Sequence, residues 1–294
     1  MRWRKSYKTT VAIRFNKHIL PKFGSRVISS IERPELLSFR AELCRLPGRK
    51  GTMTNVNVNK IMQSLKQLLD EGALRFGYTS PFVGIKSLKK ERTDVNPFTL
   101  DEVRLMLDMV REDFNPYYTV RFFTGMRPNE IDGLKWKYVD FEKRQILVRE
   151  GWVREEVTQL KTDGSARDID MTSLVYDALI EQKKRTGGME YVFCSPQGKP
   201  LRHNNVTKRV WAPLLNLLGL EYRRPYETRH TAATLWLASG EAPEYIARQM
   251  GHTTTEMLFR VYSRYVPNLT RQDGSAFENL LNKQLNPEPN TQDK

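Results

Sequence analysis

The segment Arg224–Tyr265 reads RPYETRHTAATLWLASGEAPEYIARQMGHTTTEMLFRVYSRY, and its pattern decides how the rest of the chain is interpreted. Residues Thr231–Leu237 are good helix formers that follow directly on an Arg-His pair. Gly240 is expected to end this first helix. The segment also holds two of the four histidines of the chain.

Two further helices are predicted in the same segment. Pro243 suits the first turn of a helix that ends near Met250, and Gly251 then stands where a positive φ is tolerated. Thr255 can cap a third helix, whose apolar side chains are Met257, Leu258, Val261 and Tyr262. The pattern therefore predicts three short helices in a row.

Four polar side chains of this segment stand at or near the ends of the predicted helices: Arg229, His230, His252 and Tyr262. Such residues can converge on one anion. A helix-turn-helix reader explains the same segment differently, with Ile246, Met250 and Leu258 in its core and the polar residues on the DNA backbone. This segment alone leaves both interpretations open.

Composition restricts the class of protein. A chain of 294 residues is long enough for two domains, and no run approaches the ~18 apolar residues of a membrane span. The start, MRWRKSYKTT, lacks the apolar region of a signal peptide. Cys44 and Cys194 stand far apart, which argues against a disulfide framework and a zinc site and favours the reducing cytoplasm.

The net charge of +14 is unevenly distributed. Residues 1–94 carry 20 Lys and Arg against 7 Asp and Glu, a net charge of +13, whereas residues 95–294 carry 28 against 27, a net charge of +1. The basic residues are spread among Asn, Ser and Thr instead of lining an amphipathic helix. This distribution favours nucleic acid over a membrane surface as the partner.

The basic part is predicted to be a small helical bundle. Helices are expected over Tyr7–Leu20, Pro34–Leu46 and Asn57–Phe76. The inward residues expected on the last helix are Ile61, Leu65, Leu68, Leu69 and Leu74. Such a bundle suits backbone contacts on duplex DNA, although an ordinary solvated surface is the alternative. The charged stretch Ile85–Asn96 has no apolar periodicity and is interpreted as a linker.

The remainder is predicted to be mainly helical with a small sheet. Thr99 and Glu102 form a capping-box pattern, and a buried helix over Tyr117–Thr124 should break at Gly125. Three runs of strand formers are expected to build one three-stranded antiparallel sheet: Gln145–Arg149, Glu156–Leu160 and Ala166–Met171. A further short extended piece is expected at Tyr191–Ser195, and the tail Asn286–Lys294 is polar and predicted to be disordered.

Two motifs outside the opening segment carry phosphate chemistry. In TGMRPNEI, residues 124–131, Arg127 follows the helix break and Glu130 can orient its guanidinium. In QLKTDGSARDIDM, residues 159–171, Lys161 stands beside the Asp163-Gly164 turn of a hairpin, where its ammonium can serve as an acid. Taken alone, each of these is more often a surface ion pair or a solvated lysine.

Together with RHTAAT, MGHTTT and VYSRY, these two motifs resemble the tyrosine recombinases, the family of phage and mobile-element integrases. They occur in the order and at about the spacing of that family, from Thr99 to about Gly274. The HILPKFG segment and the long helix resemble, more weakly, its core-DNA-binding domain. The resemblance implies a mainly α fold with a small antiparallel sheet (α+β), arranged as a two-domain DNA clamp.

The resemblance also implies roles for individual residues. Arg127 and Arg229 match the arginines that hold the scissile phosphate, and Lys161 matches the lysine that protonates the leaving 5′ oxygen. His252 matches the second histidine, and Tyr262 matches the nucleophile. The supporting residues are Glu130, which buttresses the first arginine, Tyr226 and His230. No metal and no cofactor is expected.

The chain departs from the family pattern at two places. Tyr226 stands where the family usually has a histidine, so proton handling is expected to fall more on His252. His252 and Tyr262 are ten residues apart, one more than the commonest interval. Tyr262 is preferred to Tyr265 as the nucleophile because it follows the apolar Val261 at the end of a periodic helix. His230 is expected to be structural more often than catalytic.

The sequence therefore predicts a core-DNA-binding domain over 1–84, a linker over 85–96, a catalytic domain over 97–276 and a C-terminal helix and tail over 277–294. The expected function is site-specific recombination through a 3′-phosphotyrosine, integrating or excising a mobile element in the cytoplasm, at the nucleoid. The expected partners are double-stranded DNA, a homotetramer assembled through Phe277–Leu285, and a DNA-bending or directionality factor.

The chain starts almost at the core-binding domain, which favours an Xer-like resolvase or an N-terminally shortened integrase. A type IB topoisomerase or a non-catalytic helix-turn-helix protein would also fit parts of this pattern.

Overall fold

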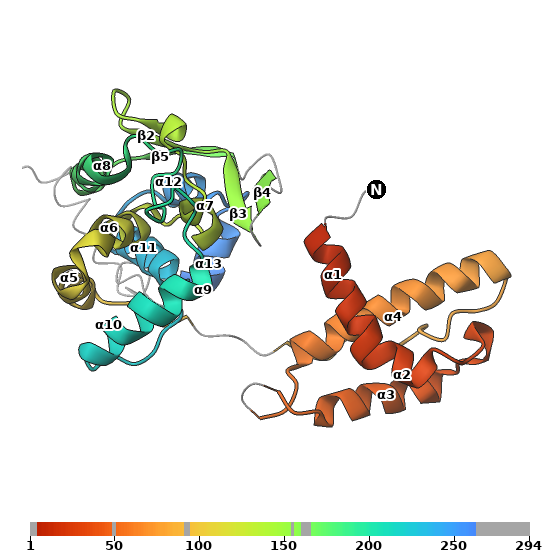
Figure 1. Ribbon diagram of the computed structural model, residues 1–294. Coiled ribbons are helices and arrows are strands. Elements are labelled where there is room, and N and C mark those ends of the chain that lie inside the picture. Colours follow the sequence, from red (N-terminus) through yellow and green to blue (C-terminus); the bar gives the residue numbers. More distant parts are fainter. Residues whose placement is uncertain (1–4, 49–50, 91–94, 154–155, 160–165, 263–294) are drawn as a thin grey trace, which may run out of the picture. The chain divides into compact units, whose positions relative to one another are not determined.

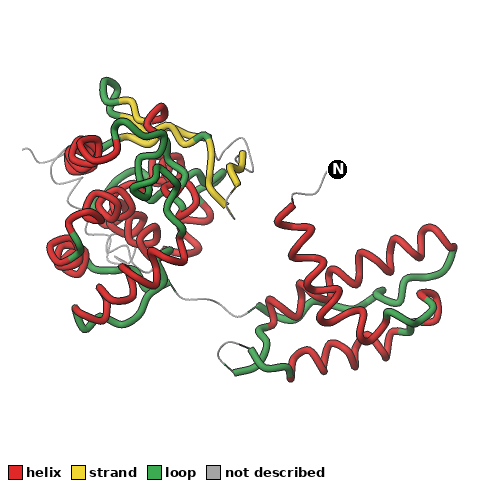
Figure 2. The backbone as a smooth tube through the Cα atoms, viewed as in Figure 1, coloured by secondary structure: helices red, strands yellow, loops and turns green. Residues whose placement is uncertain are grey.

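The computed structural model describes residues 5–48, 51–90, 95–153, 156–159 and 166–262. The chain separates into two compact units, Met1–Thr93 and Asp94–Lys294. Among the described residues, the first unit contains helices and loops, and the named strands lie in the second unit (Figure 2). The fold is thus mainly α with small antiparallel sheets, as the sequence predicts.

The first unit is built on three helical segments (Figure 1). Helix α1 (Lys5–Arg14) continues through a π-helical turn, Phe15–Ile19, into α2 (Leu20–Phe23). After the 3₁₀ turn Ile28–Ser30 come α3 (Arg33–Arg45) and the long α4 (Asn55–Phe76). The buried apolar side chains that join them are Ile19, Phe23, Ile31, Leu36, Phe39, Leu43, Val58, Ile61, Met62, Leu65, Leu69 and Phe82.

Two inward positions predicted on α4 are wrong. Leu68 is 43% exposed and Leu74 is 82% exposed, while Val58 and Met62 are buried instead. The buried face of α4 follows Val58, Ile61, Leu65 and Leu69, spaced three and four residues apart. Leu74 follows the buried Gly72 by two residues, a rotation of about 200° around the helix axis, so it lies on the outer face of α4. Residues 85–90 also pack on this unit, where Asn59 Nδ2 donates to the Leu88 carbonyl over 2.8 Å.

The second unit begins with helices that alternate with short turns. Helix α5 (Leu100–Met109) has the predicted capping box, because Thr99 Oγ1 accepts from the Glu102 N–H and Glu102 accepts from the Thr99 N–H. A 3₁₀ turn, Glu112–Phe114, leads into α6 (Asn115–Thr124), which ends at Gly125 with a left-handed φ of 60°. Helix α7 (Pro128–Asp132) follows directly, and a 3₁₀ turn, Trp136–Tyr138, closes this region.

The strands form two ladders instead of the one three-stranded sheet that the sequence predicts. Strands β1 (Val139–Asp140), β2 (Gln145–Val148) and β5 (Arg167–Asp170) make one antiparallel sheet in the order β1-β2-β5. In the described part of the chain, strands β3 (Glu150–Val153) and β4 (Glu156–Gln159) pair with each other and with no other strand. The predicted partner β4 therefore lies in a separate hairpin. Residues 191–195 make isolated bridges, Lys135 with Tyr191 and Cys194 with Pro200, but no named strand.

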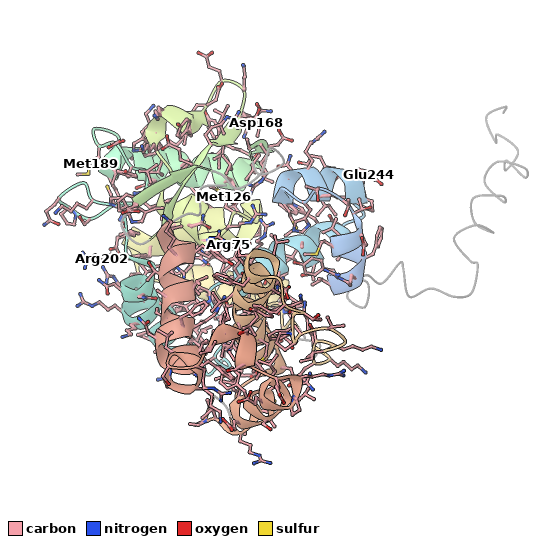
Figure 3. All side chains as sticks on the ribbon, turned by 90° about the vertical axis from the view of Figure 1, so that its right-hand side faces the viewer. Arg75, Met126, Asp168, Met189, Arg202 and Glu244 are labelled. Carbon is pink, nitrogen blue, oxygen red and sulfur yellow. The ribbon has the colours of Figure 1, made fainter. Side chains whose placement is uncertain are left out.

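Helices supply the rest of the second unit. They are α8 (Ser173–Thr186), α9 (His203–Val206) with the π-helical turn Thr207–Trp211, α10 (Ala212–Leu217), α11 (Glu227–Ala238), α12 (Pro243–Met250) and α13 (Glu256–Tyr262). Helix α6 packs against both α8 and α11, and it lies between them in Figure 1. Met126 and Asp168 mark the α6–α7 turn and strand β5 in Figure 3. Met126 is fully buried, so the α6–α7 turn lies in the interior of the unit.

An aromatic cluster holds α6 in place. Trp211 is fully buried, with its ring centroid 5.7 Å from Phe98 and 5.4 Å from Tyr118. Its Nε1 donates to the Arg223 carbonyl over 2.7 Å. A second apolar cluster ties α11, α12 and α13 together and contains Ala233, Leu237, Ile246, Ala247, Met250, Leu258 and Tyr262.

We expect Trp211→Ala to lower the free energy of unfolding of the second unit by ~3–5 kcal/mol, because it removes a large buried side chain and leaves a cavity. Urea denaturation followed by circular dichroism measures this loss. The control is Leu217→Ala on the neighbouring helix, whose side chain is exposed and whose loss should stay within ~0.5 kcal/mol. Equal losses in the two variants would contradict the central role of Trp211.

Candidate active site

Arg127 is the N-cap residue of α7 and lies directly after the left-handed Gly125 and Met126. Its Nη1 donates to Glu130 Oε1 over 2.7 Å, and its Nη2 donates to the Gly251 carbonyl over 3.1 Å. The backbone N–H of Arg127 donates to the other oxygen of Glu130 over 2.8 Å. The side chain remains 28% exposed. Glu130 thus orients the guanidinium, as the sequence predicts, and leaves part of it accessible.

Glu130 is shared between two arginines. Arg167, on β5, donates to both of its carboxylate oxygens, over 2.8 and 3.1 Å, and Arg167 Nε donates to the Gln249 carbonyl over 2.6 Å. Burial raises the pKa of Glu130, but the hydrogen bonds and charges of Arg167 and Arg127 outweigh it, so the pKa lies below its usual value. The carboxylate stays ionised and joins α7 to β5.

Arg229 lies in the first turns of α11 and is 2% exposed. Its two terminal nitrogens donate to the carbonyls of Gly125 and Met250, and Nη2 also lies 3.1 Å from His252 Nε2. Burial, followed by repulsion from Arg127, lowers the pKa of Arg229 to about 10, so the guanidinium is still charged at neutral pH. Arg229 therefore connects the α6–α7 turn to the end of α12, where Gly251 takes a left-handed φ of 66°.

A further contact in this region joins α11 to α13. His230 Nδ1 lies 2.6 Å from the hydroxyl oxygen of Tyr262, and Tyr262 is only 3% exposed. Tyr226 lies on the other side of His230, with ring centroids 5.1 Å apart at an interplanar angle of 65°. Burial raises the pKa of the Tyr262 phenol, while the charge of Arg229 opposes this effect. The phenol is therefore protonated at neutral pH in this structure.

These contacts place seven of the eight predicted site residues in two groups that join at the adjacent residues Arg229 and His230, and the two groups form the site network. The seven are Arg127, Glu130, Tyr226, Arg229, His230, His252 and Tyr262. Lys161, the eighth, lies outside the described residues, as do Tyr265 and the Phe277–Leu285 segment. The network is held by residues from α7, α11 and α13 and by the turn after α12.

Two buried arginines that have no role in the predicted site, Arg167 and Arg121, position the network. Arg167 ties Glu130 to α12, and its inward position was readable from the two-residue period with the buried Ile169. Arg121, on α6, donates to Tyr117 over 2.9 Å and to the Pro225 carbonyl over 2.8 Å, and Tyr117 donates to Asp132 over 2.6 Å. Arg121 thereby connects the start of α11 to the end of α7. The sequence indicates this role only indirectly, because Arg121 stands in the helix Tyr117–Thr124 that is predicted to be buried.

Both site histidines are neutral at neutral pH. Burial, followed by repulsion from Arg229, lowers the pKa of each of His230 and His252 to about 4. In the unfolded chain the pKa of each histidine is ~6.5, so between pH 6.5 and 4 the unfolded chain binds more protons than the folded chain. The stability that these two groups contribute is present above pH 6.5 and is lost as the pH falls towards 4.

We therefore expect the melting temperature of the chain to fall between pH 7 and pH 5 by more than that of a His230→Asn/His252→Asn double variant. Differential scanning calorimetry at constant ionic strength measures both curves. His18, in the first unit, also has a lowered pKa and contributes equally to both proteins, so it cancels in the difference. Parallel curves would contradict the buried, neutral state of the pair.

Within the described ranges, no helix is long and apolar enough to cross a membrane. The same part of the chain contains no group of three or more His, Cys, Asp and Glu side chains placed to hold a metal ion. The arrangement is instead a cationic site with one carboxylate, two neutral imidazoles and a buried phenol.

Several proteins of known structure share this fold. A Tn1549 transposon integrase in complex with a circular intermediate DNA aligns with a TM-score of 0.79 at 19% identity, over 95% of both chains. A lambda integrase tetramer bound to a Holliday junction aligns with a TM-score of 0.67 at 14% identity, over 87% of this chain and 74% of that one. At these identities the likeness establishes the fold.

Sequence comparison identifies the family. The chain is 29% identical to the putative defective protein IntQ of Escherichia coli strain K12, over 92% of this chain and 76% of that protein. It is 27% identical to the prophage integrase IntR of the same strain, over 83% and 68% of the two chains. The phage integrase family profile matches residues 96–268, which include every residue of the network described above. The chain therefore belongs to the phage integrase family, the tyrosine recombinases.

Proposed function

We propose that the chain is a site-specific recombinase that cuts and rejoins double-stranded DNA through a 3′-phosphotyrosine bond, and so integrates or excises a phage or other mobile element. One observation carries this proposal: two guanidiniums, an imidazole and a buried tyrosine meet in a single site within the matched region. The relatives named as prophage integrases, and the ICEBs1 integrase of Bacillus subtilis at 25% identity, support the mobile-element role.

The proposed reaction is a phosphoryl transfer without net hydrolysis. The Tyr262 oxygen attacks the scissile phosphorus, the bond between phosphorus and the 5′ oxygen breaks, and a 3′-phosphotyrosine forms. Arg127 and Arg229 stabilise the charge on the non-bridging oxygens, for which the planar guanidinium fork is suited. Arg229 is covered in this structure, so its guanidinium must exchange a backbone carbonyl for a phosphate oxygen when DNA binds.

The phenol proton of Tyr262 passes to a neighbouring base, and the remaining roles concern the leaving oxygen and the energy balance. Lys161 is the proposed donor of the proton that the leaving 5′ oxygen takes up, and His252, hydrogen-bonded to Arg229, supports the phosphate-binding arginine. The phosphotyrosine keeps the free energy of the broken linkage, so rejoining by a 5′-hydroxyl needs no ATP, and the arginines supply the positive charge at the phosphate. Glu130 holds Arg127 and Arg167 in place throughout.

The proposed partners follow from charge and from the related structures. The first 94 residues carry a net charge of +13, which suits phosphate contacts along duplex DNA and supports their role as the core-DNA-binding domain. The proposed boundaries remain 1–84, 85–96, 97–276 and 277–294. A homotetramer on two DNA sites, with a DNA-bending or directionality factor, is the proposed assembly, supported by the lambda integrase tetramer on a Holliday junction. The proposed location is the nucleoid of a bacterial cytoplasm.

Covalent trapping on a selected DNA site tests the function. Duplexes that bind the chain are enriched from a random library. The selected site is then nicked so that cleavage releases a short DNA fragment, which diffuses away and cannot be rejoined. We expect a protein–DNA adduct on a denaturing gel, formed in EDTA and without ATP. Site-specific binding with no adduct at any nick position would indicate a non-catalytic helix-turn-helix protein. Adducts on any duplex, with relaxation of supercoiled plasmid, would indicate a type IB topoisomerase.

A further inference from the structure

The hydroxyl of Tyr262 is directed at one side chain. His230 Nδ1 lies 2.6 Å from it, and the two rings are 5.6 Å apart at an interplanar angle of 55°. The two residues come from different helices, α11 and α13, which pack against each other. The distance is within the range from which a base can take the proton of a hydroxyl group.

His230 is in the protonation state that this role needs. Burial and the charge of Arg229 hold it neutral, so one of its two ring nitrogens carries a lone pair. The neutral tautomer with its proton on Nε2 places that lone pair on Nδ1, facing the phenol. The neighbouring Tyr226 ring packs edge-on against the imidazole and fixes its plane. Among the described residues, the titratable and charged groups near His230 and Tyr262 are Tyr226, Glu227 and Arg229, with His252 beyond Arg229.

His252 is not placed to take this proton. Its Nε2 lies 3.1 Å from Arg229 Nη2, and because a guanidinium nitrogen only donates, Nε2 must be the acceptor. The proton of the neutral imidazole is then on Nδ1, which is buried without a hydrogen-bond partner among the described residues. No hydrogen bond joins His252 to Tyr262 in the part of the chain that the structure describes. The lone pair of His252 is already used by Arg229.

We propose that His230, and not His252, is the general base for Tyr262, an inference that rests on the proposed recombinase function. As the bond between Tyr262 Oη and phosphorus forms, the phenol proton moves to His230 Nδ1 and gives an imidazolium. The bond between phosphorus and the 5′ oxygen breaks, and that oxygen takes its proton from a separate acid, for which Lys161 is the candidate. In rejoining, the 5′-hydroxyl attacks phosphorus, the bond to Tyr262 breaks, and Nδ1 returns the proton to Oη.

Substrate binding strengthens this base. Burial is the larger cause of the low pKa of His230 and the charge of Arg229 is the second, and a bound phosphate neutralises that charge. The imidazole therefore gains proton affinity when the scissile phosphate is present. The same arrangement compensates for the departure at Tyr226, because a phenol at that position is a poor base at neutral pH. The proton acceptor is thus His230, which lies four residues, or about one helical turn, after Tyr226.

The test compares His230→Ala and His230→Asn with wild type in single-turnover cleavage of the selected nicked duplex. Asparagine can keep a hydrogen bond near the Nδ1 position but cannot accept a proton. A base role predicts that both variants lose about 100-fold or more in cleavage rate, with DNA affinity and melting temperature retained in at least the asparagine variant. It also predicts that the rate of each variant rises with pH between 6 and 9, as the phenolate fraction grows, more steeply than in wild type.

A second substrate separates the base from the acid. A duplex with sulfur in place of the scissile 5′ oxygen has a leaving group that needs no proton, so it rescues the loss of a general acid and not that of a general base. We expect no rescue of the His230 variants by this substrate. Rescue by sulfur, or a wild-type rate in His230→Asn, would overturn the proposal while wild-type adduct formation left the recombinase function standing. Absence of any wild-type adduct would count against the function itself.

Discussion

Tyr262→Phe is expected to abolish the covalent protein–DNA adduct completely while leaving DNA binding unchanged. The substitution removes the one oxygen that the proposed mechanism makes nucleophilic. The ring stays in the apolar cluster with Ala233, Leu237 and Met250, and only the hydrogen bond to His230 is lost. The cost in stability should thus be about 1 kcal/mol, too small to unfold the unit.

The measurement is the denaturing gel with the nicked duplex, alongside a gel-shift titration of the same DNA. Tyr265→Phe is the matched control, since it removes the alternative hydroxyl from the same motif. An adduct that persists in Tyr262→Phe and disappears in Tyr265→Phe would keep the enzyme and transfer the nucleophile. An adduct lost in both variants would point to a structural effect of the motif on the site.

Arg127→Ala is expected to slow single-turnover cleavage at saturating DNA by a factor of about 10²–10³. Arg127 is the more accessible of the two site guanidiniums, and its proposed role is to stabilise charge that develops on the phosphate oxygens. Removal of one such donor from a preorganised site typically costs this factor. Arg127→Lys should recover only part of the rate, because an ammonium keeps the charge and loses the planar fork.

Arg248→Ala controls for the loss of a positive charge alone. Arg248 is exposed on α12 and stacks on Tyr245 at 5.3 Å, and among the described residues its side chain makes no hydrogen bond to Arg127 or Glu130. It should weaken DNA binding modestly at most and leave cleavage at saturating DNA near wild type. A comparable loss of cleavage in both variants would show that Arg127 acts only through the overall field of the protein.

The sequence predicted those elements whose ends are fixed by local chemistry. Helix α12 has the expected bounds because Pro243 starts it and the left-handed Gly251 follows it. The capping box of Thr99 and Glu102 is likewise local. Strand pairing is not local: β3 was not expected, and its hairpin with β4 removed that strand from the sheet of β2 and β5. Leu74 is a different case, because it stands two residues after the buried Gly72 and therefore lies on the opposite face of α4, a local relation that the prediction missed.

The contacts of the candidate site are likewise of two kinds: local contacts, which the sequence predicts, and contacts between distant residues, which it does not. The pair of Arg127 and Glu130 could be predicted, because three residues on a helix turn place them side by side. The contact of His230 with Tyr262 spans 32 residues and depends on how α13 docks on α11, so no spacing rule reveals it. The bridge from Arg167 to Glu130 spans 37 residues and depends on β5 lying beside α7 and α12.

The sharing of Glu130 by two arginines has a consequence for the energetics of the proposed reaction. Among the described residues of the site, the guanidiniums of Arg127, Arg167 and Arg229 and the carboxylate of Glu130 leave a surplus of two positive charges. Repulsion between these arginines adds to the effect of burial in lowering the pKa of Arg229. A phosphodiester in its ground state brings one negative charge, whereas the five-coordinate phosphorus formed on attack carries two. The site is therefore matched in charge to the transition state, and its attraction for the phosphate grows as the new bond forms.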